Sequence, residues 1–182
     1  MKKKIVILMF LFLGLFLYPV VGHTDEGGKF GLGIRGGWYK AEDADEGKLY
    51  GGLQVRWKVF PALAIEGLVD YHPEQTFPDN KKITSYPVLV SALFYLIPGA
   101  PVSPYLLGGV GWYYSKVEDN SGTNWTNDFG AHLGGGLDIP LSPQVVFNAD
   151  LRYYFLNFSD QKVKDLKTNG YIISAGFTFY LW

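Results

Sequence analysis

Eight segments of this chain carry an apolar side chain at every second position. The last segment shows the pattern most clearly, because every second residue from Tyr171 to Leu181 is apolar or aromatic, whereas Ser174, Gly176 and Thr178 lie between them. Successive side chains of a β-strand point to opposite faces, so a period of two separates two environments. The apolar set carries no charge in any of the eight segments. This favours lipid on the outside of a closed barrel.

We therefore predict an all-β fold, an eight-stranded antiparallel up-and-down transmembrane barrel. The predicted strands cover residues 29–39, 48–59, 62–71, 83–96, 105–115, 128–139, 144–155 and 171–182. Each has about the 9–11 residues that a tilted membrane strand needs. Pro87 falls within the fourth strand, where it predicts a bulge or a break because proline cannot donate to the ladder.

The connections between these strands alternate in length. Residues 40–47, 72–82, 116–127 and 156–170 form longer polar segments, whereas 60–61, 98–104 and 140–143 are short and contain proline. Outer-membrane barrels have short periplasmic turns and longer external loops. An even number of strands puts both termini on one side, so we expect the N- and C-termini in the periplasm.

The first residues are typical of an export signal. A basic start, Met1-Lys2-Lys3-Lys4, precedes an apolar run that ends at Val21, and Val20 and Gly22 are small enough for a cleavage site after Gly22. This predicts a signal peptide over residues 1–22 and a mature barrel domain over 23–182; a retained anchor is the alternative. No apolar run near twenty residues follows, which argues against a helical membrane protein.

Composition excludes several classes of function. The chain has no cysteine, so it has neither a disulfide scaffold nor a thiolate site. Its formal charge of −1 gives no indication of nucleic-acid binding. The acidic segment 42–46 lacks the spacing of a calcium loop, so we expect no metal and no cofactor.

The face opposite the apolar one carries the charges. In the predicted barrel these side chains point into the lumen: Arg35, Arg56, Lys58, Glu66, Asp70, Asp138, Asp150 and Arg152. Four positive and four negative groups balance, and charges away from water must pair or be hydrated. We interpret them as a structural salt-bridge network that fills the lumen. A polar conduction path or gate is the alternative.

Aromatic residues gather near the predicted strand ends on the apolar face. They are Trp38, Trp57, Tyr71, Trp112, Tyr114, Tyr153, Tyr171 and Trp182. Tryptophan and tyrosine prefer membrane interfaces, so these residues predict two aromatic girdles. Ordinary β-propensity also enriches such residues and is the alternative explanation.

A family resemblance comes from the C-terminal half. Residues 129–140 and 148–154, together with Ser103-Pro104-Tyr105, resemble the small eight-stranded outer membrane β-barrel superfamily, the OmpA/OmpX/OmpW-like outer membrane protein β-barrel domain. The end, residues 174–182, resembles the terminal signal that the barrel-assembly machinery recognises. The resemblance implies a wall element, an adhesion or resistance factor, a small-solute channel or, in some members, a lipid-modifying enzyme.

An enzymatic role has little support in the sequence. The histidines are His23, His72 and His132, and the His-x-Ser pairing of lipid A deacylase barrels is absent at both His72 and His132. Ser91 with Asp70 or Glu66 is the remaining combination, and it does not supply the nucleophile, base and orienting acid that a hydrolase needs.

We therefore predict a non-enzymatic Gram-negative outer-membrane barrel with a structural, adhesion or surface-interaction role. Its expected partners are outer membrane lipid, lipopolysaccharide and the barrel-assembly machinery. A narrow channel for small or hydrophobic solutes is the alternative, and a lipid A-modifying enzyme is a third hypothesis. A soluble lipocalin-like barrel is the alternative fold. In it the apolar residues of the same alternation would face inward and the polar residues outward.

Overall fold

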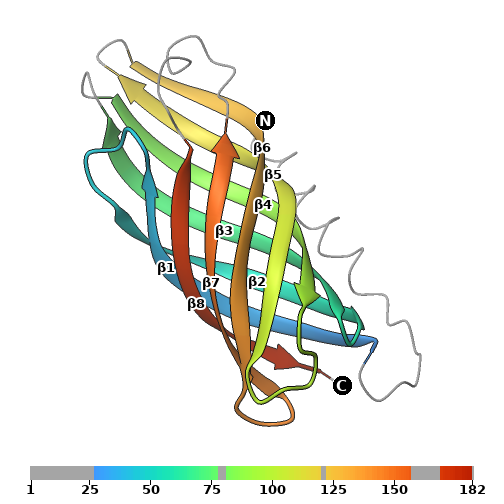
Figure 1. Cartoon of the computed structure of the whole chain (residues 1–182). Coiled ribbons are helices and arrows are strands. Elements are labelled where there is room, and N and C mark those ends of the chain that lie inside the picture. The colour runs from blue at the N-terminus through green and yellow to red at the C-terminus, as the bar shows by residue number, and fades with distance from the viewer. Residues whose placement is uncertain (1–26, 78–80, 120–121, 157–168, 182) are drawn as a thin grey trace.

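The chain forms a closed barrel of eight strands (Figure 1). The computed structural model describes residues 27–77, 81–119, 122–156 and 169–181. The strands are β1 (Lys29–Ala41), β2 (Lys48–Phe60), β3 (Leu63–Phe77), β4 (Lys81–Tyr95), β5 (Ser103–Asp119), β6 (Gly122–Pro140), β7 (Val145–Leu156) and β8 (Gly170–Tyr180). Each pairs antiparallel with the next, and β8 pairs with β1 to close the sheet. This confirms the predicted fold class.

The two ends of the barrel differ. At the turn end, short connections join β2 to β3, β4 to β5 and β6 to β7, and the described chain begins and ends there. At the loop end lie the other four connections. Within the described residues, no helix is long and apolar enough to cross a membrane. The predicted signal peptide, residues 1–22, lies outside the described part of the chain.

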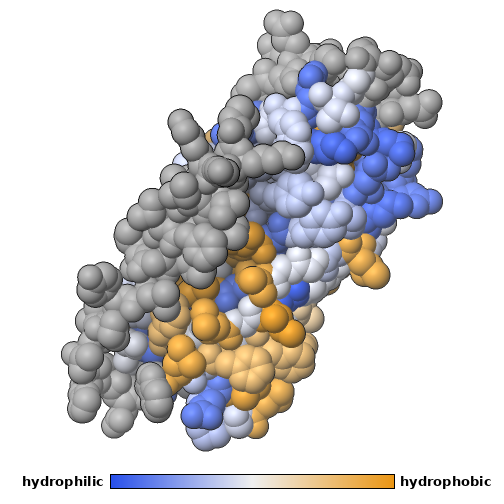
Figure 2. All heavy atoms as spheres, turned by 180° about the vertical axis from the view of Figure 1, so that it is seen from behind, coloured by the Kyte–Doolittle hydropathy of each residue, from blue (hydrophilic) through white to orange (hydrophobic). Residues whose placement is uncertain are grey.

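The strand faces are arranged as the alternation predicts. In β8 exposed and buried residues alternate at every position: Phe177 and Phe179 face outward, whereas Thr178 is fully buried. Arg56 and Arg152, on β2 and β7, are likewise fully buried. One face of the molecule shows apolar side chains over one half and polar ones over the other (Figure 2). The alternative of a soluble lipocalin-like barrel, in which the apolar residues would face inward, is therefore wrong.

Two predicted loops are largely strand. Residues 72–82 and 116–127 lengthen two hairpins, and β5 and β6 stay paired as far as Asp119 and Gly122. We placed these segments in loops because the apolar face ends there. Backbone pairing needs no apolar face, however, so the sheet continues where the outward residues become polar, as at Glu74, Lys82 and Lys116. Strands β3 to β6 thus form an extended sheet at the loop end.

The break predicted at Pro87 is present in the pairing with β3: that ladder runs to Val69–Val88 and resumes at His72–Ser85, omitting Pro87 and Tyr86. β4 pairs with β5 without interruption through Pro87, which lies opposite Tyr113, and the Pro87 ring is buried in the lumen. The register shifts in β3 between His72 and Gln75, where Pro73 and Glu74 form the bulge. Pro87 removes only one backbone donor from the ladder, and the extra residue of the bulge is accommodated beside Pro73.

Glycine on the inner face makes room for large side chains. A Cβ atom at Gly52 would lie 1.9 Å from Oδ1 of Asp70, and one at Gly136 would lie 2.6 Å from the Tyr105 hydroxyl. At Gly51, the next residue but on the outer face, the nearest atom would be 3.9 Å away. Inward glycines therefore allow a narrow barrel to hold charged and aromatic side chains.

Candidate functional site

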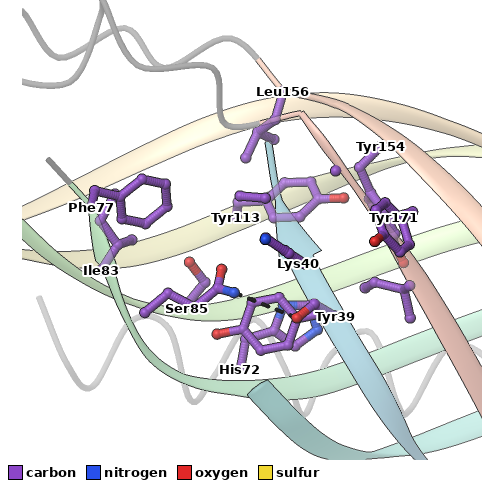
Figure 3. A pocket seen from close by; sticks show the side chains of 14 residues that line it. Tyr39, Lys40, His72, Phe77, Ile83, Ser85, Tyr113, Tyr154, Leu156 and Tyr171 are labelled. Carbon is purple, nitrogen blue, oxygen red and sulfur yellow. Dashed lines mark hydrogen bonds between the residues drawn. The ribbon is translucent and has the colours of Figure 1, made fainter. Parts of the chain in front are cut away.

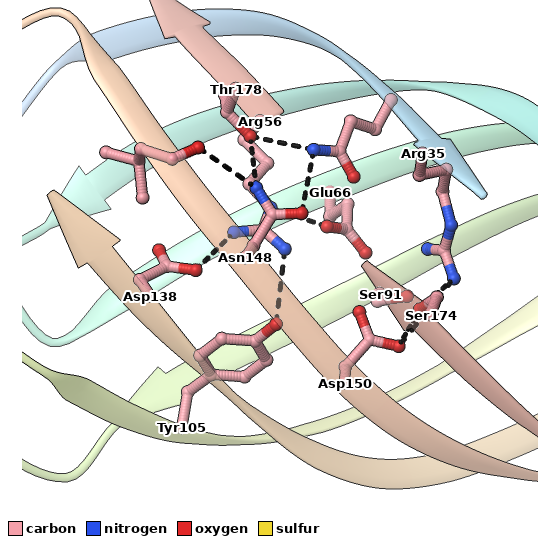
Figure 4. A network of polar contacts seen from close by, with 12 residues as sticks. Arg35, Arg56, Glu66, Ser91, Tyr105, Asp138, Asn148, Asp150, Ser174 and Thr178 are labelled. Atoms are coloured by element: carbon pink, nitrogen blue, oxygen red, sulfur yellow. Dashed lines mark hydrogen bonds and ion pairs between the residues drawn. The ribbon is translucent and has the colours of Figure 1, made fainter. Parts of the chain in front are cut away.

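The centre of the lumen is a network of ion pairs around Glu66 on β3. Glu66 accepts a hydrogen bond from Nε of Arg56 at 2.5 Å (Figure 4). It accepts another from a terminal nitrogen of Arg152 at 2.7 Å. Arg56 also reaches Asp138 at 2.8 Å, and Nε of Arg152 reaches Asp150 at 2.7 Å. These five side chains are at most 3% exposed. The network joins β2, β3, β6 and β7 across the lumen.

Arg35 and Asp70 lie nearer the loop end and are joined more loosely. Arg35 donates to the Tyr50 hydroxyl and to Oγ of Ser174, each at 2.7 Å. Its Nε lies 3.8 Å from Asp70, and a terminal nitrogen lies 3.6 Å from Asp150. Both oxygens of Asp70 lack a hydrogen-bond partner among the described residues. This part of the network therefore relies on longer ion contacts.

Lys58 lies apart from the central pairs, near the turn end. Its Nζ is 5.3 Å from the ring centroid of Tyr95 and 5.2 Å from that of Tyr180. A cation at this distance from two rings is attracted by their quadrupoles. The structure thus brings seven of the eight predicted lumenal charges into one system of ion pairs and places Lys58 between tyrosines.

Uncharged residues complete the filling of the lumen. Nε2 of Gln54 donates to Oγ1 of Thr178 at 2.8 Å and to Oδ1 of Asn148 at 3.1 Å, and Asn148 donates to Thr178 at 2.9 Å. The alternation of the sequence turns these three residues inward, but the predicted network included only the charged residues. Tyr95 donates to Asp138 at 2.7 Å. Side chains therefore span the barrel at the level of the network.

Ser91 and His132 form a pair that sequence reasoning did not connect. Oγ of Ser91 lies 2.8 Å from Nε2 of His132, and each residue is 1% exposed. The serine comes from β4 and the histidine from β6, so no motif on one strand could show the contact. Nδ1 of His132 has no hydrogen-bond partner among the described residues, so no acid orients the ring. Both side chains are buried within the lumen.

The predicted aromatic residues within the described chain lie on the outward face. Trp38 contacts Tyr171 with ring centroids 5.5 Å apart, and Trp112 contacts Phe129 at 5.3 Å. A row at the loop end contains Tyr71, Tyr86 and Trp125, with centroids 5.4 and 6.4 Å apart; we had not predicted Tyr86 or Trp125. Trp57 lies nearer the turn end, Tyr114 and Tyr153 nearer the loop end, and Trp182 is outside the described residues.

A pocket that we did not predict opens above the network, at the loop end. This vestibule comprises about 530 Å³, including space open to solvent (Figure 3). Its walls come from β1, β3, β4, β5, β7 and β8, and they include Tyr39, His72, Ile83, Tyr113, Tyr154 and Leu156. The strand extensions create it, because they carry the walls beyond the charged layer.

Comparison with known proteins decides the family. The model of the outer membrane protein beta-barrel domain matches residues 8–179, which is most of the chain. This chain belongs to that outer membrane β-barrel family. It is therefore an outer-membrane protein, and its outward apolar band faces lipid.

Solved structures agree with this family assignment at the level of the fold. Neisserial surface protein A is 15% identical, with a TM-score of 0.65, over 82% of this chain and 96% of that one. The N-terminal β-barrel domain of Pseudomonas aeruginosa OprF is 10% identical, with a TM-score of 0.61, over 83% and 97%. Ail, the attachment invasion locus protein of Yersinia pestis, is 15% identical, with a TM-score of 0.53, over 84% and 97%. A comparison with curated protein sequences gave no match.

The acidic connection between β1 and β2 shows no built metal site. Glu46 lies 3.5 Å from Nζ of Lys48, and Glu42 accepts a hydrogen bond from the Tyr153 hydroxyl at 2.5 Å. Within the described part of this family member, no three histidine or acidic side chains group as metal ligands would. These carboxylates instead contact side chains of the barrel itself.

Proposed function

We propose that this outer-membrane barrel is a non-enzymatic surface-interaction protein. The observation that supports the proposal is the extended sheet of β3 to β6, which continues beyond the lipid-facing band. In this proposal the loop end is external and both termini are periplasmic. A signal peptide over residues 1–22 directs export, the aromatic rows anchor the barrel at the interfaces, and the assembly machinery recognises the C-terminal strand.

The outer surface of the extended sheet suits contacts with lipopolysaccharide and with external partners. Trp125 is 56% exposed, and Tyr86 stacks against it. The charges beside them are paired: Lys82 lies 2.8 Å from Glu74, and Lys116 contacts Glu118. Ail has been solved with the heparin analogue sucrose octasulfate. Here the paired lysines give no strong positive patch, so we propose an aromatic and hydrogen-bonding contact rather than capture of a polyanion.

Shortening the longest hairpin should reduce attachment. The variant replaces residues 116–125 with Asn-Gly, so that the paired residues Ser115 and Thr126 flank a two-residue turn. We expect bacteria that display it to lose most of their attachment to protein-coated surfaces, because the extension with Trp125 is gone. The control exchanges the ion pair, Lys116→Glu with Glu118→Lys, and keeps the hairpin. Equal attachment by the shortened and intact proteins would contradict the proposal.

The side chains that fill the lumen favour a barrel that does not conduct solutes over a channel. An eight-stranded barrel is only wide enough for its interior to be filled by side chains, and here the ion pairs and the Gln54–Thr178–Asn148 cluster occupy it. We expect the purified protein in planar bilayers to show no steady single-channel openings, under conditions in which a wide porin conducts. Reproducible openings at low protein concentration would favour the alternative, a narrow channel for small or hydrophobic solutes.

The third hypothesis, a lipid-modifying enzyme, gains little from the structure. The Ser91–His132 pair lies inside the lumen, away from the lipid face. A lipid ester bond would have to enter the filled barrel to reach the Ser91 hydroxyl. The enclosed pair is more simply a polar contact that helps to hold Arg152, whose terminal nitrogen lies 3.4 Å from Oγ of Ser91.

A further inference from the structure

The vestibule has a chemical character that differs from the network below it. Its walls are aromatic and aliphatic: Tyr39 stacks on His72 with centroids 4.3 Å apart, and Phe77, Ile83, Leu156 and Ile172 complete them. Tyr113 and Tyr154 meet edge to face at 5.9 Å (Figure 3). Tyr154 also contacts His132, with ring centroids 5.4 Å apart. A concave apolar site with a few polar groups is the usual form of a small-molecule pocket.

Three polar groups of the lining have no protein partner. The hydroxyls of Tyr113 and Tyr154 and Nε2 of His72 are buried and make no hydrogen bond with the described residues. These residues are only 4–5% exposed. A buried polar group without a partner is costly, because it has lost its hydrogen bonds to water. Three such groups around one cavity are better explained by a polar guest than by the stability of the barrel alone.

The remaining polar groups of the lining are already engaged. Nε2 of Gln75 donates to the backbone oxygen of Glu46 at 2.8 Å, and Ser85 is hydrogen-bonded to Ser115 at 2.7 Å. The Tyr39 hydroxyl donates to the backbone oxygen of Pro73. Nε2 of His72 lies 4.0 Å from Oδ2 of Asp70 in the network below. The groups available to a ligand are therefore the two tyrosine hydroxyls.

The charge of the lining limits the class of ligand. Of the described residues that line the vestibule, only Lys40 carries a formal charge, and it follows Tyr39 at the rim. A charged ligand would lose its hydration without a set of opposite charges to replace it, which is strongly unfavourable. A neutral ligand avoids this cost, and aromatic walls favour a ring.

We propose that the vestibule binds a small, neutral aromatic molecule that carries one hydroxyl group. The ring packs against Tyr39, His72 and Ile83, and the hydroxyl exchanges hydrogen bonds with Tyr113 and Tyr154. The role is independent of the attachment surface, because the vestibule faces the lumen and the attachment surface faces outward. No covalent bond is made or broken when the molecule binds.

Two fluorinated probes test the site in the full-length barrel in detergent micelles. Binding of 4-fluorophenol and of fluorobenzene, which lacks the hydroxyl, is followed by fluorine NMR against protein-free micelles. The double variant Tyr113→Phe/Tyr154→Phe keeps both rings, and Ile83→Trp fills the cavity. Tyr114→Phe, on the outer face of the same strand as Tyr113, is the matched control. Heat-modifiable gel migration verifies that each variant is folded.

The intact protein is expected to bind 4-fluorophenol at least fivefold more tightly than fluorobenzene, since one hydrogen bond is worth about that factor. The double variant loses about fivefold for 4-fluorophenol alone, Ile83→Trp loses both probes, and Tyr114→Phe changes neither. The proposal would be overturned if each probe partitioned equally into micelles that contain the protein and micelles that do not. So would an unchanged preference for 4-fluorophenol in the double variant, or full binding by Ile83→Trp.

Discussion

Replacing Glu66 with alanine is expected to lower the free energy of unfolding by about 3 kcal/mol or more. Glu66 is fully buried and accepts hydrogen bonds from both Arg56 and Arg152. Its removal leaves two buried guanidinium groups that are each matched by only one carboxylate, Asp138 or Asp150. Removal of one partner of a buried ion pair is destabilising because the desolvation cost of the remaining charge is no longer compensated.

The measurement for Glu66→Ala is reversible urea unfolding in phospholipid vesicles, followed by tryptophan fluorescence. The matched control is Glu74→Ala, which removes one partner of the pair with Lys82 on the same strand. That pair is largely exposed, so no measurable change is expected. If both variants unfold like the parent protein, the lumenal network contributes no net stability and our interpretation of it fails.

Replacing Leu133 with arginine is expected to lower the free energy of unfolding by about 2–4 kcal/mol. Leu133 is 61% exposed and lies within the apolar outward set of β6. Because that set faces hydrocarbon, folding must transfer the charge of the new arginine from water into lipid, which costs free energy. The same substitution on a surface in water would change stability little.

Asn127→Arg provides the control for Leu133→Arg. Both positions are exposed on the same face of β6, but Asn127 lies in the extended part of the hairpin. The same vesicle unfolding experiment should show a loss for Leu133→Arg and none for Asn127→Arg. Equal effects at the two positions would mean that the band around Leu133 does not contact lipid, which would undermine the membrane topology.

The sequence predicts the strands of the barrel wall well, because lipid and lumen impose opposite requirements on alternate residues. Phe177 and Thr178 illustrate this: one faces outward and its neighbour is fully buried. The alternation is uninformative where both faces are polar, so the ends of β3 to β6 were assigned to loops. Pro87 predicts a bulge or a break because a proline in a strand gives a strong signal, and the ladder with β3 is interrupted there. The sequence does not show that the extra residue of the bulge lies on β3, between His72 and Gln75.

The candidate sites were less accessible from sequence than the fold. Inward charges could be named because their positions follow from the period of two. The partners could not, because Arg56 reaches Asp138 across the lumen and Ser91 reaches His132 from another strand. Such contacts depend on the tilt and stagger of the closed sheet. The vestibule was missed for the same reason, since its walls come from six strands and its depth comes from the unexpected extensions.

The polar bonds across the lumen bear on the order of assembly. They join residues far apart in the chain: Arg56 to Asp138 spans 82 positions, Gln54 to Thr178 spans 124, and Arg35 to Ser174 spans 139. Such bonds form only once strands that are distant in the sequence have come together around the lumen. They therefore contribute little to the speed of insertion and mainly slow the reopening of the finished barrel. In this protein the lumenal bonds form late in assembly, and they give the membrane-inserted state a long lifetime because they slow its unfolding.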